Sequence, residues 1–227
     1  MKRSAWLGMG LCLWAALFAP GCGGGSGSGT AAMLRLVQAS PDAPAVNVLI
    51  DAKSVAVNLA YGNDTGYLSV KAGSRHIQVV PVSGGAAIFD QTISFTSSTN
   101  QTLLLTGTSA AIQAVTLNDT APTVVANSGN VRVVNASATM GTADVYIVPA
   151  GSSIVGVTPV TAGLAFDQST GYQLTAAGSY EVFMTTPGTT RAFLSSGPIS
   201  LTASQNQTIV ALDGASGGFT YVRLTDQ

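Results

Sequence analysis

The sequence has 227 residues, of which only 8% are charged: nine Lys and Arg against ten Asp and Glu, with one His. Ordinary globular domains carry about 25% charged residues, so hydroxyl groups must supply much of the polar surface here, and the chain has 25 Thr and 23 Ser. The formal net charge of −1 provides no basic stripe for nucleic acid, whose phosphates need clustered Lys and Arg. One His and two Cys leave little material for catalysis. We therefore expect no enzymatic activity, no catalytic residues, no cofactor and no metal.

Residues 1–21 have the pattern of a bacterial signal peptide. Lys2 and Arg3 form a short positive segment, and residues 5–19 are an uncharged run of 15 residues. Such a run is too short to span a bilayer, which takes about 20 residues. The segment that ends at Cys22 resembles a lipobox, whose Cys is acylated and becomes the first residue of the mature chain. Lipoboxes usually have Leu three residues before the Cys, where this sequence has Ala19, so cleavage by an ordinary signal peptidase is the alternative.

A Gly- and Ser-rich segment, residues 23–29, follows Cys22 and has the composition of a polar tether. A membrane-anchored domain needs such a tether, and each buried methylene of an acyl chain contributes about 0.8 kcal/mol to anchoring. Gly23 does not resemble the Asp that retains bacterial lipoproteins in the inner membrane. We therefore expect lipid attachment at Cys22 and a location on the outer membrane, facing either the periplasm or the cell surface. A single Cys in the mature chain excludes a disulfide framework.

The rest of the chain is an internal repeat. The segment Leu34–Ser40 recurs as Val131–Ser137 at an offset of 97, and Ser98–Thr102 recurs as Ser204–Thr208 at 106. Other matches fall in order between and beyond these, and the offset only grows, to 107 at the end of the chain. This pattern indicates one duplicated unit with small insertions in the second copy, the largest within residues 148–163.

Within each unit, apolar residues alternate with polar ones, as in residues 75–80 and 101–105, and turn residues recur about every ten positions. No stretch after Cys22 keeps a helical period. The pattern predicts an all-β chain with two tandem antiparallel β-sandwiches of immunoglobulin-like type. We expect each half to fold alone and the two to sit end to end. The predicted organisation is a signal peptide at 1–21, the lipidated Cys and tether at 22–32, a first sandwich at 33–119, a linker at 120–129 and a second sandwich at 130–227.

The opening of the first unit, residues 34–48, contains a strand, the element Ser40-Pro41-Asp42-Ala43-Pro44 and a second strand. This run resembles domain-of-unknown-function family 4397, and residues 61–73 are similar to the middle of that family. The resemblance covers nearly all of 33–119 and, more weakly, 130–227, where residues 137–141 replace the Ser-Pro-Asp-Ala-Pro element. It implies a secreted or envelope protein with tandem domains. It implies no particular chemistry.

A few residues are candidates for function, each with a plainer structural alternative. The two prolines around Asp42 stiffen a loop that either presents this carboxylate to a ligand or forms a structural corner. Asp51 and Asp64 could join it around a cation, but no calcium-loop pattern exists. His76 on a strand is most simply solvent-facing, and Ser216 in a Gly-x-Ser-x-Gly run is most simply part of a hairpin loop.

The aromatic pair Tyr61 and Tyr67 recurs as Phe166 and Tyr172 at an offset of 105. A repeated packing contact explains this, and a sugar-stacking platform is the alternative. The sequence thus predicts a non-enzymatic envelope lipoprotein with a binding or structural role such as adhesion or scaffolding. Its expected partners are the membrane, through Cys22, and an envelope protein or extracellular polysaccharide. The alternative is a small-ligand or carbohydrate-binding module that uses the Ser40–Pro44 loop.

Overall fold

The computed structural model describes residues 30–227, and this part of the chain contains strands and turns but no helix. It accordingly has no helix long and apolar enough to cross a membrane. The prediction of an all-β chain built from β-sandwiches is confirmed. The predicted signal peptide and the lipidation site at Cys22 lie outside the described residues.

The first sandwich consists of two four-stranded sheets with the orders β4-β1-β7-β8 and β3-β2-β5-β6. Its strands are β1 (Ala31–Gln38), β2 (Val46–Ile50), β3 (Lys53–Leu59), β4 (Asp64–Lys71), β5 (Gly73–Pro81), β6 (Phe89–Phe95), β7 (Asn100–Thr108) and β8 (Ala111–Asn118). Strands β1 and β7 run parallel, whereas all other neighbours in this sandwich are antiparallel. The alternating pattern that predicts strands cannot distinguish the two directions.

The second sandwich repeats this arrangement. One sheet has the order β12-β9-β17-β18, with β13 also paired to β9, and the other has the order β11-β10-β14-β15, with β16 also paired to β14. Again one pair, β9 and β17, is parallel. The strands are β9 (Ser128–Asn135), β10 (Ala143–Pro149), β11 (Thr161–Leu164), β12 (Gln168–Ser169), β13 (Gln173–Ala176), β14 (Gly178–Thr185), β15 (Ala192–Ser195), β16 (Ile199–Leu201), β17 (Asn206–Asp213) and β18 (Phe219–Asp226).

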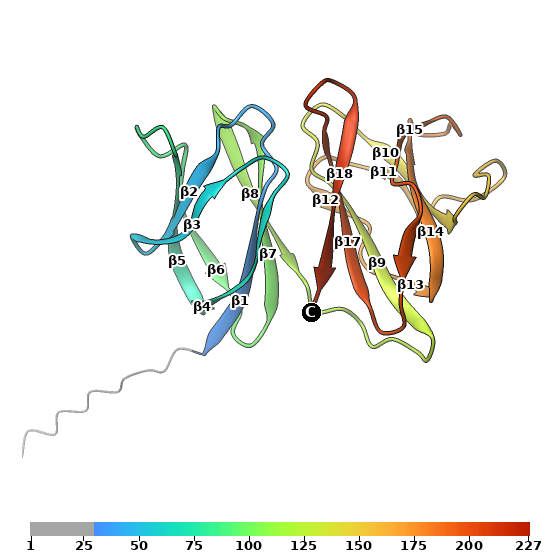
Figure 1. Ribbon diagram of the computed structural model, residues 1–227, viewed down its shortest axis with the longest axis horizontal. Helices are drawn as coiled ribbons and strands as arrows, with labels where there is room; N and C mark the ends of the chain where they lie inside the picture. Colours follow the sequence, from blue (N-terminus) through green and yellow to red (C-terminus); the bar gives the residue numbers. More distant parts are fainter. Residues whose placement is uncertain (1–29) are drawn as a thin grey trace, which may run out of the picture.

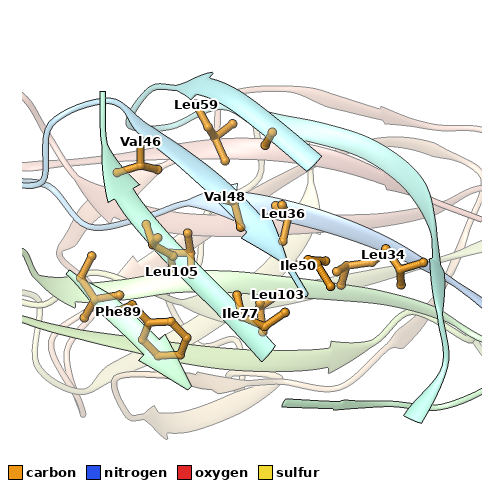
Figure 2. Close-up of a cluster of buried hydrophobic side chains, with 14 of the residues drawn as sticks. Leu34, Leu36, Val46, Val48, Ile50, Leu59, Ile77, Phe89, Leu103 and Leu105 are labelled. Atoms are coloured by element: carbon orange, nitrogen blue, oxygen red, sulfur yellow. The ribbon is translucent and has the colours of Figure 1, made fainter. Parts of the chain in front are cut away.

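Each sandwich has its own apolar core between its two sheets. In the first, Leu34 and Leu36 of β1 meet Val48 and Ile77 of the facing sheet and Leu105 of β7, and all five side chains are fully buried (Figure 2). The second core uses the matching positions, including Val131 and Val133 of β9. Residues 30–227 contain no Cys and therefore no disulfide, so cores of this kind are the main source of their stability.

The two sandwiches lie side by side, not end to end as expected from the short linker (Figure 1). The β1 sheet of the first faces the β9 sheet of the second, and a third apolar cluster fills the space between them. This interdomain core contains Val37, Ala39, Leu104, Leu117, Val134, Ala136, Val210, Leu212 and Leu224. Burial of a second apolar face is the physical reason for the arrangement, because an end-to-end packing would leave both faces in water.

Candidate functional site

The largest concentration of buried charge lies in the interdomain face. Arg35 is on β1, the second strand of its sheet, and its neighbours Leu34 and Leu36 point into the first core. Because side chains alternate along a strand, Arg35 points to the other face of the sheet, which the second sandwich covers. Arg132 occupies the same position on β9. The two arginines are 2% and 3% exposed, so both need buried partners.

These partners are supplied reciprocally across the interface. The Nη2 atom of Arg35 lies 2.5 Å from Oδ1 of Asp226 in the second sandwich, and Nη2 of Arg132 lies 2.5 Å from Oδ1 of Asp119 at the end of the first. Nη1 of Arg35 donates to the carbonyl of Thr225 at 3.0 Å, just as Nη1 of Arg132 donates to that of Asn118 at 2.8 Å. Each arginine therefore binds the last residues of the opposite sandwich.

Each carboxylate is held in turn by its own sandwich. Oδ2 of Asp119 accepts hydrogen bonds from the hydroxyls of Thr102 at 2.5 Å and Tyr67 at 2.7 Å. Oδ2 of Asp226 accepts the equivalent bonds from Thr208 at 2.6 Å and Tyr172 at 2.7 Å. The result is a network of eight side chains related by an approximate twofold axis: Arg35, Tyr67, Thr102 and Asp119, with their counterparts Arg132, Tyr172, Thr208 and Asp226. We call these eight residues the interdomain network.

The electrostatics of the interdomain network are balanced. Its two guanidinium groups and two carboxylates sum to zero charge, and the arginines also stack on tyrosine rings, Arg35 at 4.7 Å from the Tyr67 centroid and Arg132 at 4.5 Å from that of Tyr172. Burial, and then the neighbouring carboxylates, raise the pKa of Tyr67 above its usual value. Burial also raises the pKa of Tyr172. The network therefore stays protonated on its tyrosines and is suited to holding the two sandwiches together.

Tyr61, the other aromatic residue of the first copy, belongs to the same interface. Besides the two tyrosines of the network, Tyr61 donates a hydrogen bond across the interface to the carbonyl of Asp213 at 2.7 Å, and burial raises the pKa of Tyr61 to about 12. For Tyr67 and Tyr172 the geometry therefore favours the interpretation as a repeated packing contact, and this contact lies between the sandwiches.

The carboxylate of Asp42 stabilises a neighbouring turn. Although the residue is exposed, Oδ1 accepts a hydrogen bond from the backbone N–H of Ser109 at 2.7 Å, and Oδ2 accepts one from its hydroxyl at 3.0 Å. The backbone bond is the main reason that the pKa of Asp42 is lowered. In the second sandwich the carboxylate is on the opposite partner. The loop after β9 supplies the donors, the hydroxyl of Ser137 and the N–H of Ala138, and Asp213 of β17 accepts both hydrogen bonds. A ligand role for Asp42 stays a prediction.

The other candidate residues are not brought together. Asp51 accepts from the backbone N–H of His76 and from Arg75, and Asp64 accepts from the N–H of Gly66. His76 is exposed and contacts Asp90 on the next strand. Within residues 30–227 no group of three or more His, Cys, Asp or Glu side chains is placed to hold a metal ion.

Ser216 lies in the turn between β17 and β18, which pair as an antiparallel hairpin. The N–H of Gly214 donates to the carbonyl of Gly218, closing this turn. A hydrolase of the Gly-x-Ser-x-Gly type would instead need its Ser between a strand and a helix.

A groove runs between β3 and β4, the edge strands of the two sheets of the first sandwich. One cavity of about 460 Å³ lies between residues 55–59 and 62–68, and a second of about 270 Å³ continues from Val55 to the end of β4. Both mix apolar side chains with polar ones, as in small-molecule sites. Neither cavity is lined by the Ser40–Pro44 loop, so the sequence did not predict this groove.

Comparison with solved structures finds likenesses at low identity. The multi-modular glycogen-degrading pneumococcal virulence factor SpuA matches at 13% identity over 85% of this chain, with a TM-score of 0.27, and the chain spans only 22% of its length. A family 41 carbohydrate-binding module from streptococcal virulence factors matches at 12% identity over 78% of this chain and 92% of its own, also with a TM-score of 0.27.

A candidate cell adhesion protein from Bacteroides fragilis NCTC 9343 matches at 11% identity over 86% of this chain and 98% of its own, with a TM-score of 0.27. Scores at this level carry no conclusion about function. No curated protein matches the sequence.

One protein-family model matches residues 32–146, which is half of the chain. The matched region contains nearly the whole first sandwich, the linker, β9 and the first half of β10. The chain therefore belongs to the family described as domain of unknown function (DUF4397).

Proposed function

We propose that the chain is a non-enzymatic lipoprotein of the bacterial cell envelope, held on the outer membrane by acylated Cys22, with a binding or structural role. The second sandwich is then a second copy of the DUF4397 fold. The repeated strand order and the four pairs of equivalent residues in the interdomain network support this duplication.

The observation that carries the proposal is the interdomain network itself. It joins the two sandwiches through buried ion pairs, with the apolar interdomain core on the same face. Rigid tandem sandwiches suit a protein that presents a surface at a distance from a membrane, as adhesion and scaffold proteins do.

The acidic side chains of the described chain take part in hydrogen bonds that fix turns, strand pairs and the interface. All ten Asp and Glu residues lie within the described chain, and each accepts at least one hydrogen bond from another group of the protein. Asp144, for example, accepts from the N–H groups of Gly163 and Gly188 and so fixes two turns.

Membrane fractionation of cells that express the wild type or Cys22→Ala tests the anchor. We expect the wild type in the membrane fraction, labelled by a fatty-acid analogue, and the variant in the soluble fraction. Protease treatment of intact cells then distinguishes a surface-facing from a periplasmic protein. If Cys22→Ala changes neither labelling nor fractionation, the chain is not a lipoprotein.

A carbohydrate- or small-ligand-binding module is the second candidate, and the groove between β3 and β4 is the observation that favours it. A glycan array probed with the mature protein tests this function. Val57→Asp places a charge in the groove, and Val155→Asp in the second sandwich is a matched control because both valines are 73% exposed. Loss of a glycan signal in the first variant alone would support the groove. A signal unchanged in both would exclude it.

A further inference from the structure

The basic side chains of this charge-poor protein are unevenly distributed. Seven remain after the signal peptide, and two of them, Arg35 and Arg132, are buried in the interdomain network. Of the five others, three line the same cavity of about 270 Å³ at one end of the first sandwich: Lys53, Lys71 and Arg75. Only one acidic residue, Asp51, lines it with them. A cluster of this kind in a chain of negative net charge is a local positive site.

The three cations come from two turns that meet at the cavity, the β2–β3 turn and the β4–β5 turn. Lys53 follows the tight turn between β2 and β3, Lys71 ends β4, and Arg75 lies near the start of β5. Arg75 is held in place, with Nη1 at 3.1 Å from Oδ2 of Asp51 and Nη2 donating to the carbonyl of Ala72 at 3.0 Å. Both lysines are exposed, and among residues 30–227 neither forms an ion pair. Their charges are available to an anion.

The cavity lies at the end of the sandwich where the chain enters. Ala31, the first residue of β1, pairs with Lys71, and the N–H of Ala72 donates to the carbonyl of Thr30 at 3.1 Å. Figure 1 shows β1 beginning at this end, beside the end of β4. Seven residues, 23–29, separate Cys22 from Thr30, and the eight Cα–Cα steps can span at most about 28 Å. A lipid on Cys22 would therefore keep this end of the sandwich close to the bilayer surface.

The second sandwich lacks the site. At the repeat offset of 105, Ala176 takes the place of Lys71 and Tyr180 that of Arg75. The turn that carries Lys53 is replaced by the longer connection between β10 and β11. The cations are thus not needed to build the fold, and they are present only in the sandwich that follows the lipidation site.

We propose that the cavity lined by Lys53, Lys71 and Arg75 binds the phosphate of an anionic lipid headgroup in the membrane to which the protein is attached. This inference rests on the proposed lipid anchor. Stable membrane attachment commonly combines a lipid anchor with a second interaction. A basic cluster near the bilayer surface supplies such an interaction with anionic lipids. Binding there would also fix the orientation of the rigid two-sandwich body on the membrane.

Vesicle flotation of the mature chain carrying Cys22→Ala tests the site without any contribution from acylation. At an ionic strength of about 0.01 M, where charges act over roughly 30 Å, we expect binding to vesicles of phosphatidylglycerol and phosphatidylcholine but not to phosphatidylcholine alone. A basic side chain near an anionic surface changes the partition coefficient by about fivefold, so K53Q/K71Q should lower it by about 30-fold.

The matched control is R191Q/R223Q, which removes the same two charges from exposed positions of the second sandwich and should leave vesicle binding nearly unchanged. Equal losses in both double variants, or no binding to anionic vesicles, would overturn the proposal. A third outcome is that the protein binds an anionic polysaccharide such as alginate but no vesicles, and that K53Q/K71Q abolishes this binding. That outcome would overturn the lipid headgroup as the ligand and favour an anionic glycan. The chain used in flotation carries no acyl group, so a negative result there does not bear on the lipid anchor. The anchor is tested separately by the membrane fractionation of Cys22→Ala.

Discussion

Replacing Asp226 by Asn removes a charge that the fold buries completely, while it keeps the shape of the side chain. In the wild type this carboxylate accepts hydrogen bonds from Thr208 at 2.6 Å, Tyr172 at 2.7 Å and Arg35 at 2.5 Å. The substitution leaves the Arg35 guanidinium, whose side chain is 3% exposed, without its closest counter-ion. Breaking a buried ion pair in this way costs about 3–5 kcal/mol.

That loss is a large part of the 5–15 kcal/mol that stabilises a typical protein. Urea unfolding followed by circular dichroism is the suitable assay, since residues 22–227 contain no Trp for fluorescence. We expect a marked drop in the unfolding midpoint for Asp226→Asn. Asp51→Asn is the control, because it removes an exposed carboxylate paired with Arg75 and should change the midpoint little.

A double-mutant cycle with Arg35→Met separates the ion pair from other effects. Because the two residues contact each other across the interface, the double variant should lose about 1–3 kcal/mol less than the sum of the single variants. Additive effects, or a cost for Asp226→Asn no larger than that of the surface control, would refute the idea that this network couples the sandwiches.

Three other outcomes follow from the same structure. Residues 30–120 alone expose the face around Leu104, so we expect this fragment to self-associate in analytical ultracentrifugation, and a monomer that unfolds cooperatively would show that the interface is dispensable. Burial raises the pKa of Tyr67 and Tyr172, so the folded state keeps protons that the unfolded chain releases above about pH 10; stability should therefore fall as the pH rises past 10, less steeply in the double Phe variant. Gly107→Ala should cost more than Gly163→Ala in thermal unfolding, because both have positive φ but only at Gly107 would the new Cβ meet a backbone atom, at 2.6 Å from the carbonyl oxygen of Ala111.

Much of the fold follows from local patterns in the sequence. Alternation of apolar residues and the regular turn residues depend on neighbours along the chain, and they suffice to predict strands and sandwiches. The duplication is equally visible, since the segments around Arg35 and Arg132 match without reference to structure. Even Asp119 and Asp226 stand at equivalent places in the last matched segment.

The burial of these matched charged residues between the two sandwiches was not predictable from the sequence pattern. On a strand with one face in its own core, the alternate residues are expected in water, so Arg35 reads as a surface residue. In the structure, β1, β7, β9 and β17 are buried on both faces because the sandwiches pack side by side. The groove and the cation cluster were missed for a similar reason, since Lys53 meets Lys71 and Arg75 only when the β2–β3 and β4–β5 turns are folded together.

The sequence by itself determined the strand content, the repeat and the family to which the chain belongs, because each depends on residue order alone. Only the tertiary structure decided which side of each strand faces water. The hydrophobic effect is non-directional, so an apolar face of a strand is stabilised by burial against any apolar surface. The amino-acid composition and the period of the apolar residues therefore cannot specify which surface covers it. The specific choice is made by groups that require defined geometry, here Arg35 and Arg132 with the carboxylates of the opposite sandwich.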